Sequence, residues 1–171
     1  HARQAEPVIM IAVRPMMPED VSDACRILNQ IIEAGGSTAF EIPFSEPLFA
    51  ESYLDGPDKI CCHVVLDDQG QVAGFQWLGT NDALPADCAD IATFTRRHPV
   101  LRGAGRALFD ETAKSAKAFG YAGINATIRA DNVLGLSYYD KMGFKDFSVA
   151  YGVPLRDGTP INRLSKRYVL H

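Results

Sequence analysis

The sequence is short of the features that mark several large classes of protein. Its four cysteines include one adjacent pair but no Cys-x-x-Cys spacing, which argues against a zinc site and against a disulfide framework. No apolar run approaches the length of a transmembrane helix, and no segment has the pattern of a signal peptide. The formal net charge is −4, which gives no support to nucleic-acid binding. We therefore expect a cytoplasmic protein with reduced cysteines, no metal, no membrane contact and no nucleic-acid partner.

The chain is long enough for one domain with a substantial core, since it has 171 residues and 47% of them are hydrophobic. It contains no repeat, low-complexity tract or linker. We expect a single domain over residues 10–170. Residues 1–9 are expected to be an N-terminal extension that is either not native or disordered, because the stretch from Met10 looks like a natural start.

Hydrophobic periodicity and turn signals predict alternating strands and helices. Strands are expected near residues 9–13, 60–66, 71–78, 90–95, 121–128, 144–151 and 163–170, and helices near 18–34, 47–54, 104–119 and 132–142. The order β-α-α-β-β-β-α-β-α-β-β predicts an α+β fold. Its central sheet should be mixed and mostly antiparallel, with about seven strands and about four flanking helices.

The most informative segment is a glycine-rich turn before an expected helix, where residues 102–107 read Arg-Gly-Ala-Gly-Arg-Ala. The first N–H groups of a helix have no partner inside it, and the helix dipole favours negative charge there. Glycines let a ligand approach the main chain closely. The segment therefore predicts a backbone site for a phosphate or pyrophosphate. Four arginines lie in or near it: Arg96, Arg97, Arg102 and Arg106.

Three glycine-loop patterns compete for this segment. The P-loop needs a Lys-Ser/Thr pair after its last glycine, and Arg106 and Ala107 stand there instead. The dinucleotide fingerprint needs a third glycine, but that position is Leu108 and the loop lies past mid-chain, so NAD binding is the weaker alternative. The third pattern, Arg/Gln-x-x-Gly-x-Gly/Ala, is satisfied at every position from residue 102 to residue 107.

This third pattern resembles the pyrophosphate-binding loop of the GNAT superfamily of acetyl-CoA-dependent N-acetyltransferases. Residues 132–144 are similar to a second motif of that family, Asn-x-x-(small)-x-x-x-Tyr-x-x-(Leu/Met)-Gly-Phe, with Tyr139 seven residues after Asn132. The two motifs and the strand before them span residues 90–147. Residues 27–41 are similar to the start of the phosphinothricin and methionine-sulfone acetyltransferase branch.

The resemblance implies transfer of acetyl from acetyl-CoA to an amine, in a ternary complex without a covalent enzyme intermediate. It implies CoA contacts in the loop and at the start of the following helix, from Arg102, Gly103, Ala104, Gly105, Arg106, Ala107 and Asn132. In the family, the strand before the loop pairs with the pantetheine amides, which maps to Phe94, Thr95 and Arg96. A backbone N–H near Phe94 and Thr95 should stabilise the oxyanion.

Tyr139 matches the family's general acid, which protonates the leaving thiolate, whereas Tyr138 is expected to face elsewhere on the helix. Related enzymes carry a glutamate base on the strand before the loop, but ungapped counting puts Ala92 at that position. Asp90, two residues earlier and on the same strand face, is the candidate base and would act through a water. A strand-end or turn aspartate is an alternative interpretation of Asp90.

Glu33, Thr38 and Glu41 flank the Gly35-Gly36 turn, where the family builds its acceptor pocket, and are candidate substrate-binding residues. The branch acetylates small amino-acid analogues and is usually dimeric, so we expect a small amino-acid-like amine as substrate and a homodimer. Two alternatives stay open: a protein or peptide N-acetyltransferase, and an acetyl-CoA-binding module without turnover.

Overall fold

The computed structural model describes residues 11–171, so the expected extension over residues 1–9 lies outside the described part. The elements follow one another in the expected order. The strands are β1 (Ala12–Pro15), β2 (Lys59–Leu66), β3 (Val72–Gly79), β4 (Cys88–Thr95), β5 (Gly123–Arg129), β6 (Lys145–Pro154) and β7 (Pro160–Val169). The helices are α1 (Val21–Ala34), α2 (Glu46–Phe49), α3 (Ala104–Ala118) and α4 (Val133–Met142), with a 3-10 turn η1 (Pro18–Asp20) before α1 and a π turn η2 (Ala50–Leu54) after α2.

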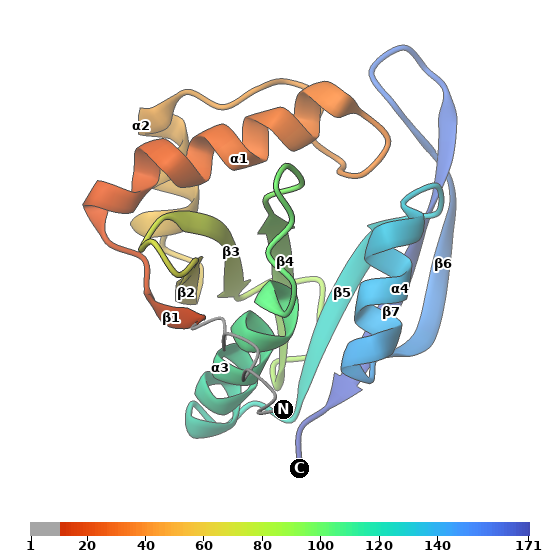
Figure 1. Ribbon diagram of the computed structural model, residues 1–171. Coiled ribbons are helices and arrows are strands. Elements are labelled where there is room, and N and C mark those ends of the chain that lie inside the picture. The colour runs from red at the N-terminus through yellow and green to blue at the C-terminus, as the bar shows by residue number, and fades with distance from the viewer. Residues whose placement is uncertain (1–10) are drawn as a thin grey trace, which may run out of the picture.

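All seven strands form one sheet in the order β1-β2-β3-β4-β5-β7-β6. Neighbouring strands are antiparallel except β4 and β5, which run parallel. The predicted α+β fold with a mixed, mostly antiparallel sheet is therefore confirmed. Because β5 pairs with β7 rather than β6, the β6–β7 hairpin forms the far edge of the sheet (Figure 1).

Helices cover both faces of the sheet (Figure 1). Helices α1 and α2 pack on one face, in a core where Leu28 and Phe49 meet Phe75. Helices α3 and α4 pack on the other face, where Phe109 and Met142 share a core with strand β5. Strands β2 to β4 are apolar on both faces for this reason, because each face is covered by a helix.

The adjacent cysteines illustrate this double coverage. Cys62 is buried in the core beneath α1, and Cys61 is half-buried against the core beneath α3. Neither thiol is fully exposed, because α3 covers the face of β2 on which Cys61 lies. All four cysteines are free.

No helix among the described residues is both long and apolar enough to cross a membrane. Within residues 11–171, no group of three or more His, Cys, Asp or Glu side chains is placed to hold a metal ion.

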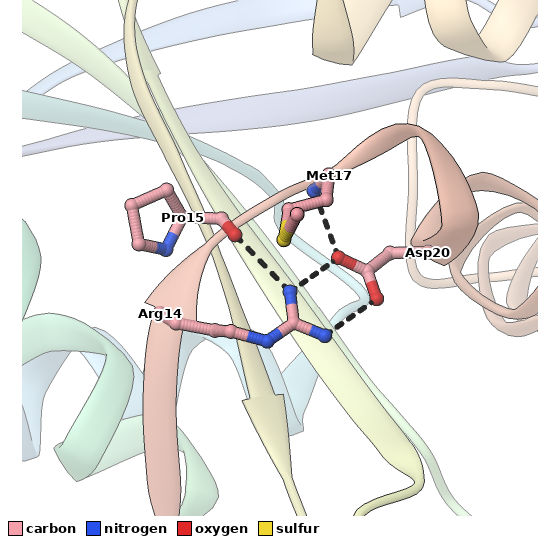
Figure 2. A network of polar contacts seen from close by, with 4 residues as sticks. All are labelled: Arg14, Pro15, Met17 and Asp20. Carbon is pink, nitrogen blue, oxygen red and sulfur yellow. Dashed lines mark hydrogen bonds and ion pairs between the residues drawn. The ribbon is translucent and has the colours of Figure 1, made fainter.

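Helix α1 begins beside a buried carboxylate (Figure 2). Asp20 accepts hydrogen bonds from the Arg14 guanidinium at 2.6 and 2.9 Å and from the Met17 N–H at 2.8 Å. Burial raises the pKa of Asp20, but the hydrogen bonds from Arg14 and Met17 outweigh it and hold the pKa below its ordinary value. The pair ties β1 to the start of α1, whose apolar stripe then packs on the sheet and ends at Gly35 with φ +73°.

We expect Asp20→Asn to destabilise the fold by about 2 kcal/mol at neutral pH, because it leaves Arg14 without its charged partner. The lowered pKa means that the carboxylate stabilises the fold above its unfolded-state pKa and loses this effect as the pH falls through the folded-state value. Urea unfolding of the native chain and the variant at pH 7 and pH 3 measures both the loss of stability and its dependence on pH. Asp23→Asn, at an exposed ion pair on the same helix, is the control and should change stability little. An equal gap between Asp20→Asn and the native chain at both pH values would contradict this account.

Candidate functional site

Strands β4 and β5 separate part of the way along the sheet. They pair only at Cys88–Asp90, opposite Gly123–Asn125. Beyond Asp90, β4 continues to Thr95 beside β3, and β5 continues to Arg129 beside β7, and the two strands diverge (Figure 1). The edge of β4 that faces β5 is therefore free from Ile91 to Thr95.

The alternation of the β3–β4 ladder decides which N–H groups face this opening. The Arg96 N–H donates to the Ala73 carbonyl at 2.7 Å, and the register continues unbroken along β4. The Phe94 N–H therefore points to β3 as well, whereas those of Thr93 and Thr95 point to the opening. Of the two positions expected to supply an oxyanion donor, only Thr95 is correctly oriented.

A cavity of about 230 Å³ lies at this opening. Its walls come from the loop after α1, from β4 and β5, from α4 and from β7: Ser37, Thr38, Ala39, Phe40, Ala92, Thr93, Phe94, Thr127, Ile128, Arg129, Asn132, Tyr139 and Arg163. Adjacent residues of β4 point to opposite faces of the sheet, and Ala92 and Thr93 both line the cavity. The cavity therefore passes through the plane of the sheet.

The glycine loop leads from this opening into α3. Gly103 adopts the left-handed conformation, with φ +84°. The first full helical hydrogen bond runs from the Ala107 N–H to the Gly103 carbonyl, and the Ala104 N–H donates to Leu101, which leaves the N–H groups of Gly105 and Arg106 ahead of the helical ladder. The backbone anion site expected here therefore has fewer donors than residues 103–107 offer, because the N–H groups of Ala104 and Ala107 already donate within the turn.

The four arginines near the loop are not equivalent. Arg102 and Arg106 are exposed, and Arg106 donates to the Lys141 carbonyl at 3.1 Å. Arg96 instead forms an ion pair with Asp67 at 3.1 Å and donates to the Pro99 carbonyl. Its guanidinium therefore fixes the chain before the loop rather than standing free for a ligand.

Tyr139 lies where a general acid is expected, on the wall of the cavity. Helix α4 is capped by Asn132, whose side chain accepts from the Gly135 N–H, and Tyr139 follows two turns later. Its hydroxyl lies 2.9 Å from the Thr93 hydroxyl. Burial raises the pKa of Tyr139 above its ordinary value, so the hydroxyl is protonated and able to donate at neutral pH.

Tyr138, the neighbour of Tyr139 on α4, does not line the cavity but contacts the glycine loop. Its hydroxyl donates to the Gly105 carbonyl at 2.8 Å and accepts from the Gln76 side chain at 3.0 Å. A Cβ on Gly105 would lie 2.5 Å from the Tyr138 ring, so the ring packs against the bare glycine backbone. Burial raises the pKa of Tyr138 to about 12. Tyr138 thus faces elsewhere than Tyr139, and it meets the glycine loop because α3 and β3 both approach this face of α4.

Two arginines supply the charge of the cavity. Arg129 pairs with Asp131 at 2.8 Å and donates to the Thr38 carbonyl at 3.0 Å. Arg163 lies directly opposite Arg129 on β7, and its side chain makes no hydrogen bond or ion pair with any described residue. Like charges opposite one another are unfavourable, and Asp131 neutralises only one of them. The cavity therefore presents one uncompensated positive charge.

The loop after α1 is held against the cavity by the same region. Besides the contact from Arg129 to Thr38, the Asn132 amide donates to the Ser37 carbonyl at 2.8 Å. Thr38, a candidate substrate-binding residue, thus lines the cavity. The polar atoms of Asn132 are engaged in these contacts, which gives it a structural role in addition to its expected contact with CoA.

The two candidate glutamates lie elsewhere. Glu33 lines a separate groove on the outer side of α1. The Glu41 carboxylate accepts the backbone N–H of Arg156 at 2.9 Å, at the tip of the β6–β7 hairpin. Glu41 therefore joins two loops, and neither glutamate is brought to the cavity.

Asp90 lies on β4 at the last point where β4 and β5 still pair. Its carboxylate accepts from Asn125 at 3.1 Å and from Asn81 at 3.2 Å, and it is not among the residues that line the cavity. No Asp, Glu or His belongs to the described lining.

Sequence reasoning missed Gln76, Thr93, Arg129 and Arg163. The sequence did contain a signal for Gln76, because its amide is the polar side chain in the otherwise apolar run Phe-Gln-Trp-Leu over residues 75–78. The two arginines are neighbours only because β5 pairs with β7, a pairing that the order of elements does not reveal.

No protein-family model matches the sequence, and a search of curated proteins finds no match. Solved structures do match. An N-acetyltransferase from Staphylococcus aureus Mu50 has a TM-score of 0.83 and 19% identity, covering 95% of this chain and 99% of that one. A GNAT superfamily phosphinothricin acetyltransferase from Sinorhizobium meliloti, in complex with acetyl-CoA, has a TM-score of 0.81 and 18% identity, covering 94% and 88%.

A ribosomal-protein-alanine N-acetyltransferase from Brucella melitensis has a TM-score of 0.79 and 19% identity, covering 93% of this chain and 99% of that one. The likeness thus includes relatives named for a small acceptor and for a protein acceptor. It extends over nearly the whole length of each chain, and the chain has the fold of the GNAT N-acetyltransferases.

Proposed function

We propose that the chain is an acetyl-CoA-dependent N-acetyltransferase that acetylates the primary amine of a small amino-acid-like molecule by direct attack in a ternary complex. The observation that carries the proposal is the opening between β4 and β5, which leads from the glycine loop to a cavity lined by Tyr139. A fold shared with N-acetyltransferases supports the same activity.

The residues at the opening suit acetyl-CoA. The free N–H groups of Gly105 and Arg106, at the start of the long helix α3, would hold the pyrophosphate with the exposed Arg102 beside them. The free edge of β4 would pair with the amides of the pantetheine arm, as an added strand does. Bound there, acetyl-CoA supplies an acetyl group activated as a thioester.

Two groups of the chain would then act on the reaction. The Thr95 N–H, which points to the opening, would donate to the oxygen on which negative charge develops. Tyr139 would give its proton to the leaving sulfur, since its hydroxyl is neutral at physiological pH and lines the cavity.

For the general base we keep Asp90, the residue suggested by the sequence, which would act at a distance. No carboxylate lines the described cavity, so the proton of the acceptor ammonium would leave through water. Asp90 lies on the same face of β4 as Ala92, which does line the cavity, and its carboxylate would take up that proton.

The cavity favours a small anionic acceptor over a peptide. Its volume of about 230 Å³ is below the roughly 300–1,000 Å³ typical of pockets for drug-sized ligands. The contact between Glu41 and Arg156 joins the loop after α1, part of which lines the cavity, to the β6–β7 hairpin. The unpaired Arg163 would bind a carboxylate of the acceptor.

Acetyl-CoA should raise the melting temperature by several degrees, because saturation at 100 times Kd stabilises a protein by about 2.7 kcal/mol and each kcal/mol shifts a chain of this size by about 2–4 °C. NAD and ATP serve as controls and should have no effect. Release of free thiol is then screened over amino acids and other amines. Stabilisation by NAD alone would contradict the proposal, and stabilisation by acetyl-CoA without turnover of any amine would favour a binding module.

Arg163→Gln should raise the KM for an amino-acid acceptor by about 10-fold or more, because a charge-assisted hydrogen bond is worth about 1.5–3 kcal/mol. The KM for acetyl-CoA should change little. The sharpest comparison is between an amino acid and its decarboxylated amine, since the variant should lose the preference for the acid. Arg156→Gln, an exposed arginine at the hairpin tip, is the matched control. An unchanged preference in Arg163→Gln would place the acceptor anion elsewhere.

We also propose a homodimer through the edge strand β6. A ten-residue edge strand with free N–H and C=O groups invites pairing, and β6 exposes Phe147, Val149 and Tyr151 along it. A second copy can pair with this edge symmetrically, as isologous interfaces require.

Light scattering after gel filtration should give twice the chain mass for the native protein, and Val149→Lys together with Tyr151→Lys should give the monomer. Phe119→Lys, at an equally exposed aromatic residue after α3, should leave the dimer intact. A native monomer at high micromolar concentration would refute this assembly.

A further inference from the structure

Four polar side chains form one connected set on the face of the sheet beneath α4. Gln76 on β3 is fully buried, and its Nε2 donates to the Thr93 hydroxyl at 2.9 Å and to the Tyr138 hydroxyl at 3.0 Å. The Thr93 hydroxyl lies 2.9 Å from that of Tyr139. Gln76 and Thr93 face each other across β3 and β4 at a position without backbone hydrogen bonds between them, where side chains approach most closely.

We propose that Gln76 and Thr93 form a hydrogen-bond chain that directs the proton of Tyr139 into the cavity and so positions the general acid. The inference deepens the proposed function and rests on it. Thr93 touches the cavity, whereas Gln76 acts through Thr93 and is a positioning residue.

Either hydroxyl could be the donor between Thr93 and Tyr139, and the hydrogen bond that Thr93 accepts from Gln76 favours Thr93 as the donor. The Thr93 oxygen already accepts from Gln76, and a hydroxyl that accepts a hydrogen bond becomes a better donor. Its single hydrogen has the Tyr139 oxygen as its partner at 2.9 Å. With Thr93 as donor, the hydrogen of Tyr139 is free to point into the cavity, which Tyr139 lines.

The burial of Gln76 supports a role for its amide. Its Oε1 is buried and has no hydrogen-bond partner among the described residues, which is unfavourable in a core. A leucine at this position would carry no such penalty. The two donor hydrogens are what the amide provides and an apolar side chain does not, and rules of core packing are broken most often at functional sites.

The second hydrogen of the same amide connects the acid to the glycine loop. Gln76 donates to Tyr138, and Tyr138 donates to the Gly105 carbonyl at 2.8 Å. One buried side chain therefore fixes both the residue that would protonate the sulfur and the turn that would hold the pyrophosphate.

The proton transfers of the reaction show what the hydrogen bond from Thr93 to Tyr139 would do. The acceptor nitrogen forms the new C–N bond, the C–S bond breaks with its electron pair on sulfur, and sulfur takes the hydrogen of Tyr139. The Tyr139 oxygen is then negative and accepts the Thr93 hydrogen bond more strongly, until it takes up the proton that the acetylated nitrogen releases. Thr93 thus stabilises the form of Tyr139 in which burial is least favourable.

The test is Thr93→Val, which removes the hydroxyl and keeps the shape. We expect kcat to fall about 10-fold or more, approaching the loss in Tyr139→Phe, while the affinity for acetyl-CoA stays within about twofold. Thr93→Ser should recover most of the rate. Thr112→Val is the control for the loss of a threonine hydroxyl, because Thr112 is buried on α3, more deeply than the half-buried Thr93, but its hydroxyl has no hydrogen-bond partner in the described structure. It should keep its rate and its melting temperature.

A binding measurement gives a readout apart from turnover. A thiolate accepts a hydrogen bond from Tyr139 more strongly than a neutral thiol does, so the native protein should bind CoA more tightly than desulfo-CoA, and increasingly so as a rising pH ionises the thiol. Thr93→Val and Gln76→Leu should reduce this preference about threefold or more, with the affinity for desulfo-CoA unchanged in Thr93→Val.

A rate and a CoA preference in Thr93→Val that match the native protein would refute the proposed hydrogen-bond chain but leave the proposed acetyltransferase activity standing. An equal loss in Thr112→Val would also overturn it, because the effect would then be one of packing. If neither acetyl-CoA nor CoA binds the native protein, the proposed function is refuted, and the role proposed for the hydrogen-bond chain is refuted with it.

Discussion

The site depends on one constraint, the early end of pairing between β4 and β5. After they part, each strand keeps its other neighbour: β4 pairs with β3 from Asp90 to Thr95, and β5 pairs with β7 over its whole length. A sheet that opens in its middle exposes backbone donors and acceptors on rigid strands rather than on loops. Those groups need a partner, and an extended ligand with its own amides is one that fits.

The opening also determines which side chains can meet. A strand normally shows each side chain to only one face of its sheet, but at a gap both faces are accessible from the same space. Ala92 and Phe94 reach the cavity from the face of α1, and Thr93 reaches it from the face of α4. The contacts from Arg129 and Asn132 to the loop after α1 then hold that loop against the side of the cavity.

Much of this architecture could be predicted from the sequence, because it is encoded locally. The order of elements, the left-handed Gly103 before α3 and the Asn132 cap of α4 each follow from residues close together in the chain. Residues whose role depends on pairing between distant strands escaped prediction. Arg163 faces Arg129 only through the β5–β7 ladder, and Glu41 meets the β6–β7 hairpin rather than the cavity, since a turn pattern says nothing of what packs against it.

Tyr138 shows the same limit at a single helix position. Adjacent residues on an isolated helix point about 100° apart, so only one of two neighbouring tyrosines should reach a given site. In the folded chain Gln76 lies between the two hydroxyls in the network and Gly105 leaves room for the Tyr138 ring, so both tyrosines are used. Glycine at residue 105 therefore has two roles: its N–H is left free at the start of α3, and its missing side chain and its carbonyl receive Tyr138. The pattern that marks the glycine loop is, for this reason, a constraint on α4 as well as on the ligand.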